Sequence, residues 1–482
     1  MQNAREFSGL DRKERMRLDS RGIPLRPAEG RVLDFDDVVL PLDAERAIYE
    51  ASRCIHCPDA APCTKACPAH NDISLAMSYI EKGEFIEAAK VYRQTSSMPE
   101  ICGRVCPHEQ LCQGACVRGK KGDPVLTGLL EAFVTDYQRQ HDGYKLKVPF
   151  PTGRSVAIVG AGPAGLACAE QLVQRGHWVT IFDAKPAPGG LLTYGIPNFK
   201  LPKQVVTGWW QDLEEAGVTF VGNTYIGRSR SINDLFHEGY EAVFIGVGAG
   251  VDAPMSVPGE DLPGVYKATE FLIRTNVDQE LLPSHIHPLR PVKGQPHPEL
   301  GRKVVVIGAG DTASDCLRSA LRLGADEVTC LYRRTEAEMP GGKKDRELAQ
   351  AEGATYQLLT QPVRFIPGEN GRLARVECIK MELGEPDAKG RRRPVPVKGS
   401  NFIVEADTAV LALGYYPDPI IGATTPGLKT HKWGLIITDP ETGATSRMGV
   451  FVGGDVVTGP DLVVTAMVAG RKAANTIDAY LY

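Results

Sequence analysis

The sequence predicts an α/β protein with an N-terminal α-helical domain followed by two Rossmann-like domains, the second inserted in the first. Three observations predict this architecture. At 482 residues the chain is too long for one hydrophobic core. An apolar run that breaks into a glycine-rich turn occurs at Val156 and again 148 residues later at Val304. A further apolar strand with a glycine stop, Gly449–Asp455, lies near the C-terminus and is expected to return to the first of these two domains.

Bulk composition narrows the class of protein. The chain is 43% hydrophobic and 24% charged, which is typical of soluble globular proteins. A net charge of -4 gives no reason to expect a nucleic acid or an anionic membrane as partner. The first 21 residues lack the apolar core of a signal peptide, and no apolar run reaches membrane-spanning length. We therefore expect a cytoplasmic protein, in which a disulfide framework is not expected.

The helical domain is predicted over residues 1–148. Apolar residues within Ser74–Lys82 and Phe85–Tyr92 recur at loosely helical spacing. Eight of the twelve cysteines fall here in two groups of four: Cys54, Cys57, Cys63 and Cys67, then Cys102, Cys106, Cys112 and Cys116. Each group contains a Cys-Pro pair, as in ferredoxin-like cluster binding, where one run can ligate two clusters. Zinc, which favours short self-contained cysteine pairs, is the alternative. The pattern favours iron-sulfur clusters.

The first glycine loop predicts a bound dinucleotide. Gly160 permits the tight turn, Gly162 lets the backbone approach a pyrophosphate, and Gly165 lets the next helix pack on the strand. Ala161, Pro163 and Ala164 complete this loop. Asp183 ends the next apolar run and is placed to accept hydrogen bonds from a ribose hydroxyl. Glycines that serve packing alone are the alternative.

Two further segments are expected to approach the same cofactor, a flavin. Gly189–Lys200 is an irregular loop that can approach a flat ring, so Gly190, Leu191 and Lys200 are predicted to contact it. Gly454 and Asp455 form a turn before a helix expected from about Asp461 to Tyr480. The positive N-terminal end of that helix would favour a reduced, anionic flavin; helix capping by Asp461 is the compatible alternative. We assign 149–290 and 432–482 to an FAD domain.

The second glycine loop predicts a nicotinamide dinucleotide in residues 291–431. Its cofactor-binding candidates are Gly308, Gly310, Asp311 and Thr312. Where an NAD site places an acid, this chain has Arg333 and Arg334, whose guanidinium groups suit the 2'-phosphate of NADPH. Two exposed arginines at a strand edge are the alternative. The Pro- and His-rich stretch Pro283–Pro298 is expected to link domains, and Arg391–Arg393 to form a solvated hairpin tip.

Assembled, these motifs resemble the small (beta) subunit of bacterial NADPH-dependent glutamate synthase over nearly the whole chain. Especially similar are Pro99–Pro107, the Gly-Ile-Pro-Asn-Phe-Lys200 loop, Met339-Pro-Gly, Lys432-Trp-Gly-Leu and Asp461–Met467. The electron-input half of dihydropyrimidine dehydrogenase and related ferredoxin:NADP reductase subunits are similar too.

The resemblance implies a ligand set for two 4Fe-4S clusters. One cluster would be held by Cys54, Cys57, Cys63 and Cys116, and the other by Cys67, Cys106, Cys112 and Glu131. By itself Glu131 is more simply explained as a surface acid on a helix. Cys102 is not among the family's ligands. Five residues separate Cys57 from Cys63, where the family usually has four.

The resemblance also implies a reaction. A hydride passes from NADPH to FAD, and single electrons pass through the clusters to a large (alpha) subunit that makes L-glutamate from L-glutamine and 2-oxoglutarate. No acid-base catalyst is predicted, because the nicotinamide and the flavin supply the chemistry. A hetero-oligomer is expected. Alternatives are the electron-input subunit of a dihydropyrimidine dehydrogenase-like or ferredoxin:NADP reductase-like complex, and a zinc-stabilised dinucleotide-sensing interaction protein.

Overall fold

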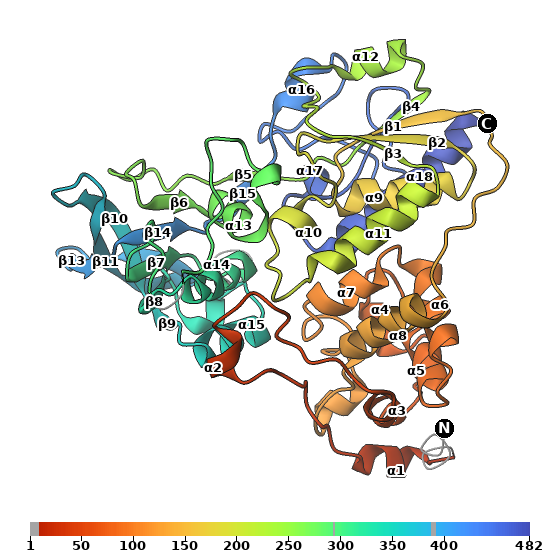
Figure 1. Ribbon diagram of the computed structural model, residues 1–482, viewed down its shortest axis with the longest axis horizontal. Helices are drawn as coiled ribbons and strands as arrows, with labels where there is room; N and C mark the ends of the chain where they lie inside the picture. Colours follow the sequence, from red (N-terminus) through yellow and green to blue (C-terminus); the bar gives the residue numbers. More distant parts are fainter. Residues whose placement is uncertain (1–8, 293–294, 387–391) are drawn as a thin grey trace.

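The computed structural model describes residues 9–292, 295–386 and 392–482 and divides them into three domains (Figure 1). An α-helical domain lies below a first α/β domain, and a second α/β domain lies beside both. Among the residues described, no helix is both long enough and apolar enough to cross a membrane. The predicted architecture, including the insertion of the second α/β domain in the first, is confirmed.

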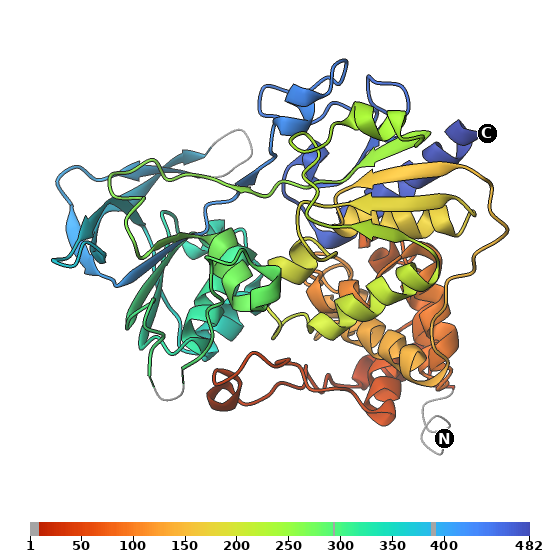
Figure 2. The same cartoon turned by 45° about the horizontal axis from the view of Figure 1, so that its top comes forward.

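The helical domain contains eight α-helices, counted over its described residues 9–148. They are α1 (Arg12–Arg17), α2 (Ala28–Arg31), α3 (Ala44–Ser52), α4 (Pro62–Ala66), α5 (Ile73–Ile80), α6 (Phe85–Thr95), α7 (Pro99–Val105) and α8 (Thr127–His141). Asp11, Asp43 and Asp72 accept backbone hydrogen bonds at the starts of α1, α3 and α5, which satisfies amides that the helices leave unpaired. Residues 23–42, which include α2, leave the other helices and run beside the second α/β domain (Figure 2). We call them the arm.

The first α/β domain is built on a parallel sheet in the order β16-β4-β1-β2-β3. Its strands are β1 (Ser155–Val159), β2 (Trp178–Phe182), β3 (Thr219–Val221), β4 (Ala242–Ile245) and β16 (Val450–Val452). Its helices are α9 (Pro163–Val173), α10 (Leu191–Tyr194), α11 (Lys203–Glu215), α12 (Ile232–His237), α16 (Ile420–Thr424), α17 (Asp455–Thr458) and α18 (Val463–Leu481). Because β16 comes from the C-terminal part of the chain, the sheet is completed only after the inserted domain.

The inserted domain has a second parallel sheet in the order β6-β14-β7-β8-β9. Its strands are β6 (Val265–Lys267), β7 (Lys303–Ile307), β8 (Glu327–Leu331), β9 (Thr355–Gln357) and β14 (Thr408–Leu411), with helices α13 (Ala268–Asn276), α14 (Asp311–Arg322) and α15 (Lys343–Ala351). An antiparallel sheet of β10 (Thr360–Pro367), β11 (Leu373–Pro386), β12 (Arg392–Pro396) and β13 (Phe402–Glu405) extends it. Arg392 and Arg393 are exposed at the start of β12, and because Arg391 lies outside the described residues, the hairpin tip stays a prediction.

The domain boundaries differ from those predicted. The chain crosses between the two α/β domains at β5 (Val251–Asp252) and β15 (Tyr415–Tyr416), which pair antiparallel. Strand β6 pairs with β14, so residues before 290 already belong to the inserted domain. Leu289 is buried in that domain's core, so Pro283–Pro298 is not an interdomain link. After the crossing back, Ile421 packs in the core of the first domain, before the predicted boundary at 432.

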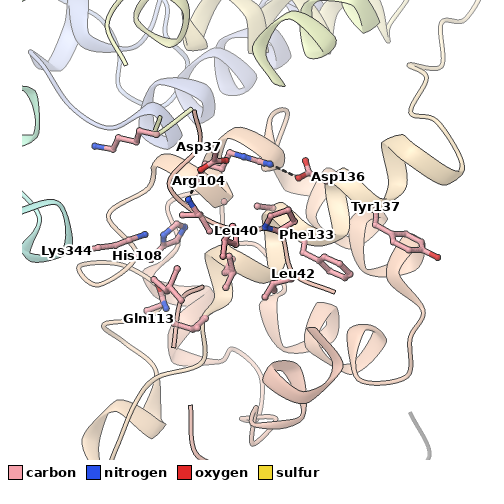
Figure 3. Close-up of a pocket in the computed structure, with 18 of the residues that line it drawn as sticks. Asp37, Leu40, Leu42, Arg104, His108, Gln113, Phe133, Asp136, Tyr137 and Lys344 are labelled. Carbon is pink, nitrogen blue, oxygen red and sulfur yellow. Dashed lines mark hydrogen bonds and ion pairs between the residues drawn. The ribbon is translucent and has the colours of Figure 1, made fainter. Parts of the chain in front are cut away.

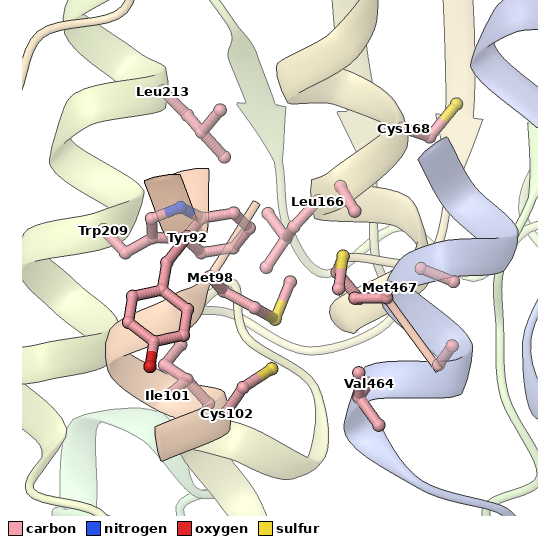
Figure 4. Close-up of a cluster of buried hydrophobic side chains, with 14 of the residues drawn as sticks. Tyr92, Met98, Ile101, Cys102, Leu166, Cys168, Trp209, Leu213, Val464 and Met467 are labelled. Carbon is pink, nitrogen blue, oxygen red and sulfur yellow. The ribbon is translucent and has the colours of Figure 1, made fainter. Parts of the chain in front are cut away.

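The helical domain and the first α/β domain share one hydrophobic core (Figure 4). Met98 and Ile101 of the helical domain lie fully buried near Trp209 of α11 and Met467 of α18. Burying each of these side chains stabilises the contact by roughly 1.5–3 kcal/mol. The helices that carry the cysteines are therefore fixed relative to the first α/β domain.

Candidate functional site

The first glycine loop has the geometry of a phosphate-binding turn. Gly160 has φ +102°, and a Cβ there would lie 2.5 Å from the carbonyl oxygen of Gly246. A Cβ on Gly165 would lie 1.9 Å from the carbonyl oxygen of Gly160, so α9 can pack this closely only with glycine. A Cβ on Gly162 would meet no heavy atom within 4 Å, so this side of the loop is open to a ligand. Pro163 begins α9, directly after this open position.

Asp183 holds the same loop from the end of β2. One carboxylate oxygen accepts a hydrogen bond from the backbone amide of Ala161 at 2.7 Å, and the other accepts one from the amide of Lys185 at 2.7 Å. Burial raises the pKa of Asp183. A carboxylate oxygen accepts more than one hydrogen bond, so these contacts leave lone pairs for a ribose hydroxyl.

Segments far apart in the sequence converge on this loop. Gly190 has φ +53°, and a Cβ there would lie 2.8 Å from the Cα of Gly162. A Cβ on Gly454 would lie 3.1 Å from the Cβ of Ala164. The loop around Gly190 and the turn at Gly454 therefore meet at the glycine loop, as expected if all three bind one cofactor.

The residues that follow these glycines lie in the same region. Leu191 begins α10 and is 47% exposed. Asp455 begins α17, and burial raises its pKa to about 6 although the backbone amide of Asp461 donates to its carboxylate. That amide lies just before α18, so the start of this long helix is next to the site.

Lys200, in contrast, lies at a contact with the inserted domain. Its ammonium group is 2.6 Å from a carboxylate oxygen of Asp345 and 3.4 Å from one of Asp315, both in the inserted domain. Burial alone would lower the pKa of Lys200, but these two carboxylates raise it above its usual value. The side chain is thus committed to a contact between domains, and its predicted contact with a cofactor stays a prediction.

The second glycine loop repeats this geometry at the start of α14. Gly308 has φ +125°, and a Cβ there would lie 2.1 Å from the carbonyl oxygen of Ala412. A Cβ added at Gly310 would be in van der Waals contact with Pro340 at 3.9 Å, without a clash. Asp311 accepts a hydrogen bond from the amide of Gly342 at 2.8 Å, which holds the Met339–Gly342 segment against the loop. Thr312 follows in the first turn of α14 and is partly exposed.

The predicted phosphate-binding arginines lie at the carboxyl end of β8. In parallel α/β sheets, ligands bind at this edge. Arg333 is exposed, and Arg334 is half-buried. The Nε of Arg334 donates a hydrogen bond to the carbonyl oxygen of Arg392 at 3.0 Å, which fixes it against the β11–β12 hairpin. Both arginines therefore lie next to the loop that would bind the pyrophosphate of the same dinucleotide.

The cysteines of the helical domain line two separate cavities. Cys54, Cys57, Cys63 and Cys116 line the first, and Cys67, Cys106, Cys112 and Glu131 line the second together with Cys102. None of these cysteines forms a disulfide. The additional residue between Cys57 and Cys63 falls in the exposed turn at residues 58–60, so it does not separate the two side chains.

The chemistry of this donor set fits an iron-sulfur cluster. Burial, together with the other thiols of the cavity, raises the pKa of Cys54 to about 12 and that of Cys63 to about 11. In the second cavity, burial likewise raises the pKa of Cys67 to about 11 and that of Cys112 to about 12. Thiolates gathered in an apolar cavity need positive charge, which iron supplies. Each set thus fits the group that the sequence predicts.

Glu131 is not the surface acid that its sequence context alone suggests. It is 7% exposed on α8, and the amide of Asn71 lies 3.3 Å from one of its carboxylate oxygens. Thr95 in turn donates to Asn71 at 2.6 Å. Cys102, which the family's ligand set omits, is 3% exposed in the same cavity. The second cavity therefore offers five candidate ligands. Sequence reasoning set Cys102 aside and missed Asn71, for which the closeness to Cys67-Pro68 was the available signal.

The second cavity also touches the first α/β domain. Val464, in the first turn of α18, is one of its lining residues. Because the amide of Asp461, just before α18, donates to Asp455, the start of α18 is close to both the cavity and the predicted flavin site. A cluster in the second cavity would be the nearer of the two clusters to a flavin.

A larger cavity of about 230 Å³ lies under the arm (Figure 3). Its walls come from the arm, α7 and α8, and Lys200 and Lys344 of the two α/β domains reach its rim. His108 is buried there with an unpaired Nε2, and burial lowers its pKa to about 3. Arg104 pairs with Asp136 across the wall. Sequence patterns do not reveal this cavity, because the residues that form its walls are far apart in the chain.

Two protein-family models match the helical domain and the α/β part of the chain separately. A family model described as dihydropyrimidine dehydrogenase domain II, 4Fe-4S cluster, matches residues 31–143. A second, described as pyridine nucleotide-disulphide oxidoreductase, matches residues 154–470. Mycobacterium tuberculosis FprA in complex with NADPH shares the fold with a TM-score of 0.55 and 21% identity, over 68% of this chain and 84% of that one. The chain is an NADPH-dependent flavin and iron-sulfur oxidoreductase, and it uses FAD, NADPH and iron-sulfur clusters, as predicted.

Individual relatives identify the family of this chain more narrowly. The glutamate synthase [NADPH] small chain of Escherichia coli is 39% identical over 95% of this chain and 96% of its own length. The putative oxidoreductase AegA of the same organism is 41% identical over 99% of this chain and 72% of its own length. The NADPH-Fe(3+) oxidoreductase subunit beta of Geobacter sulfurreducens is 37% identical over 87% of this chain and 64% of its own length. The chain belongs to the family of glutamate synthase [NADPH] small chains and serves as an electron-input oxidoreductase.

Proposed function

We propose that this chain is the electron-input subunit of a glutamate synthase. In this proposal it oxidises NADPH and passes the electrons to a large subunit, which makes L-glutamate from L-glutamine and 2-oxoglutarate. The main support is that the two cysteine cavities and the proposed flavin site belong to two domains that share one core, with Val464 of α18 lining the second cavity. The similarity to small chains from Escherichia coli and Halomonas elongata, at 39% and 41% identity, supports the choice of reaction.

We assign the FAD site to the converging segments of the first α/β domain. Gly160, Gly162 and Gly165 would bring the backbone of the loop to the pyrophosphate, while Asp183 would bind a ribose hydroxyl. Ala161, Pro163 and Ala164 shape the same loop. Gly190, Leu191, Gly454 and Asp455 would surround the flavin end. The supporting observation is that these segments contact one another around the open side of Gly162.

We assign the NADPH site to the equivalent edge of the inserted domain. Gly308, Gly310, Asp311 and Thr312 would bind its pyrophosphate at the start of α14, and Arg333 and Arg334 its 2'-phosphate. The bond from Arg334 to the β11–β12 hairpin supports this assignment, because it holds a guanidinium group at the ligand-binding edge of the sheet. A held guanidinium group loses less conformational entropy when it binds a phosphate.

We assign a 4Fe-4S cluster to each cysteine cavity. Cys54, Cys57, Cys63 and Cys116 would hold the first, and Cys67, Cys106, Cys112 and Glu131 the second. FAD, when bound, converts the two-electron chemistry of NADPH into single-electron steps that such clusters accept. The protein would align and shield these groups: Val464 of α18 lines the second cavity, and α18 packs in the core that the two domains share. No side chain is needed as an acid-base catalyst.

The isolated chain tests the division of labour. Purified without oxygen, it is expected to oxidise NADPH with ferricyanide as acceptor and to form no glutamate from glutamine and 2-oxoglutarate. Formation of glutamate by the isolated chain would show that it is not merely an electron-input subunit. Failure to oxidise NADPH with any acceptor, at full flavin and iron content, would contradict the electron-input role itself.

A second candidate function keeps the same chemistry but changes the acceptor. The family model over residues 31–143 carries the name of dihydropyrimidine dehydrogenase, which supports an electron-input module of a dihydropyrimidine dehydrogenase-like or ferredoxin:NADP reductase-like complex. The subunit that binds this chain distinguishes the two candidates. In both of them the chain works in a hetero-oligomer.

A further inference from the structure

The two α/β domains are joined by a narrow connection. Only two chain segments cross between them, β5 and β15, and these pair through two residues each. Short connections of this kind allow one domain to rotate relative to the other. Transfer between a nicotinamide and a flavin requires the reacting atoms to approach within about 3–3.5 Å. The inserted domain must therefore be held in place by contacts outside the connection.

The arm provides such contacts from the helical domain. It begins after α1, where Arg118 donates a hydrogen bond to the carbonyl oxygen of Leu18 at 2.7 Å. Within the arm, an ion pair between Arg26 and Asp34 at 2.6 Å closes the loop around α2. The arm returns to the helices at α3. It is thus fixed at both ends to the domain that carries the cysteines.

On one side the arm contacts the inserted domain. The Nε of Arg31 donates to a carboxylate oxygen of Glu352 at 2.7 Å, and Arg31 and Glu352 are both buried. Arg318 and Arg322 of α14 donate to the same carboxylate at 2.7–2.9 Å. Three guanidinium groups therefore surround one buried carboxylate, and one of them comes from another domain. Removing a partner from such a buried cluster leaves charge uncompensated.

On its other side the arm contacts the loop that leads from the flavin site. The rings of Phe35 and Phe199 have centroids 6.0 Å apart, and the amide of Val38 donates to the carbonyl oxygen of Phe199 at 3.1 Å. The guanidinium groups of Arg318 and Arg322 also lie over the Phe199 ring, 4.5 and 4.0 Å from its centroid. Phe199 therefore contacts the arm and the inserted domain at once.

Phe199 belongs to the segment that begins at Gly189 and Gly190 in the predicted flavin site. One residue further on, Lys200 pairs with Asp345 of α15. The same short segment would thus meet the flavin at one end, and it contacts the inserted domain at the other. A change in the contact between the arm and Phe199 would therefore alter the positions of the proposed flavin site and of the inserted domain.

We propose that the arm is a strap that sets the distance between nicotinamide and flavin, with Arg31 and Phe35 as positioning residues. Neither residue touches the proposed cofactors; each acts through Glu352 or Phe199. Because the strap belongs to the iron-sulfur domain, that domain controls the approach of NADPH to the flavin as well as the departure of electrons from it.

The test compares Arg31→Ala and Phe35→Ala in the full-length holoprotein with Leu33→Ala as matched control. Leu33 is on the same arm and is 75% exposed, so its truncation removes little buried surface. Rapid mixing with NADPH without oxygen gives the limiting rate of flavin reduction and the Kd for NADPH. We expect the limiting rate to fall at least about tenfold in both variants while the Kd changes less than about twofold, since the proposed NADPH site is intact. Arg31→Lys should recover only part of the rate, because an ammonium group lacks the guanidinium fork.

A limiting rate of flavin reduction within twofold of wild type in Arg31→Ala and Phe35→Ala would contradict the proposed role of the arm. So would an equal fall in Leu33→Ala. Flavin and iron contents are measured first, and if Arg31→Ala does not retain them, Phe35→Ala decides the question because it leaves no buried charge unpaired. A general loss of structure would change the rate of flavin reduction by dithionite as well, whereas a positioning role leaves it unchanged.

Discussion

Gly190 lies so close to Gly162 that a Cβ on Gly190 would be 2.8 Å from the Cα of Gly162. The two residues belong to different segments, one following β1 and the other following β2. Gly190 also has φ +53°, where side chains other than hydrogen are strained. The contact therefore ties the predicted flavin loop to the predicted phosphate loop, and it depends on glycine at this position.

Gly190→Ala is expected to weaken FAD binding at least about tenfold, because the added methyl group must push the two loops apart. Gly217→Ala is the control: Gly217 also has positive φ, +95°, but a Cβ there would meet nothing within 4 Å. Gly217→Ala should lower the free energy of unfolding by about 1–2 kcal/mol and leave FAD binding unchanged. Titration of the flavin-free proteins with FAD measures the difference. Equal affinity in the two variants would remove Gly190 from the site.

Arg333→Ala with Arg334→Ala is expected to raise the KM for NADPH far more than the KM for NADH, because only NADPH carries the 2'-phosphate. Arg302→Ala is a suitable control, since Arg302 is exposed at the opposite edge of the same sheet and pairs with Asp326. Steady-state kinetics with both coenzymes give the comparison. A similar rise for NADPH and NADH would contradict the phosphate assignment.

Glu131→Ala and Cys102→Ala separate the candidate ligands of the second cavity. If Glu131 is the fourth ligand, its removal should reduce the iron content from about eight towards about four atoms and abolish one cluster signal in electron paramagnetic resonance. Cys102→Ala should keep the full iron content and both cluster signals. The opposite result, with loss in Cys102→Ala and retention in Glu131→Ala, would make Cys102 the ligand and Glu131 its neighbour.

Asp455→Asn tests the environment of the predicted flavin turn through the pH dependence of stability. Burial raises the pKa of Asp455 to about 6 from the usual 3.8, so the folded protein binds this proton more tightly than the unfolded chain. The free energy of unfolding contributed by this group therefore falls as pH rises from about 4 to about 6 and is constant above. Flavin-free Asp455→Asn should be more stable than flavin-free wild type by at most about 3 kcal/mol at pH 7.5.

The advantage of Asp455→Asn should shrink as the pH is lowered from 6.5 to 5. Urea unfolding of the two flavin-free proteins across that range measures it. A difference in stability that does not change with pH would show that the carboxyl group of Asp455 has an ordinary pKa in the folded protein.

Much of the fold follows from local sequence pattern. The strand, glycine turn and helix at Val156 and at Val304 are each encoded within about ten residues, so both turns could be placed without a structure. The boundary at 290 failed because β6 is only three residues long, too short for a pattern of alternating residues to reveal it. The two-residue strands β5 and β15 are shorter still.

The contents of the second cavity depend on packing that sequence does not record. A Cβ on Gly103 would lie 2.6 Å from the backbone nitrogen of Ala132, so α7 and α8 touch closely at this glycine. That contact brings Cys102 and Glu131, one residue before each of these positions, into one cavity. The arm is similar: Arg31 and Glu352 meet although they are 321 residues apart. Their pairing is a property of the assembled domains.

The measurement that tests the central claim most directly is purification of this chain without oxygen from cells that express it at its native level. The subunit that copurifies is identified, and glutamate formation from glutamine and 2-oxoglutarate is assayed with NADPH. The account predicts a large subunit and glutamate formation that falls at limiting NADPH when Arg333 and Arg334 are replaced by alanine. A different redox partner, with no glutamate formed, would contradict the glutamate synthase assignment.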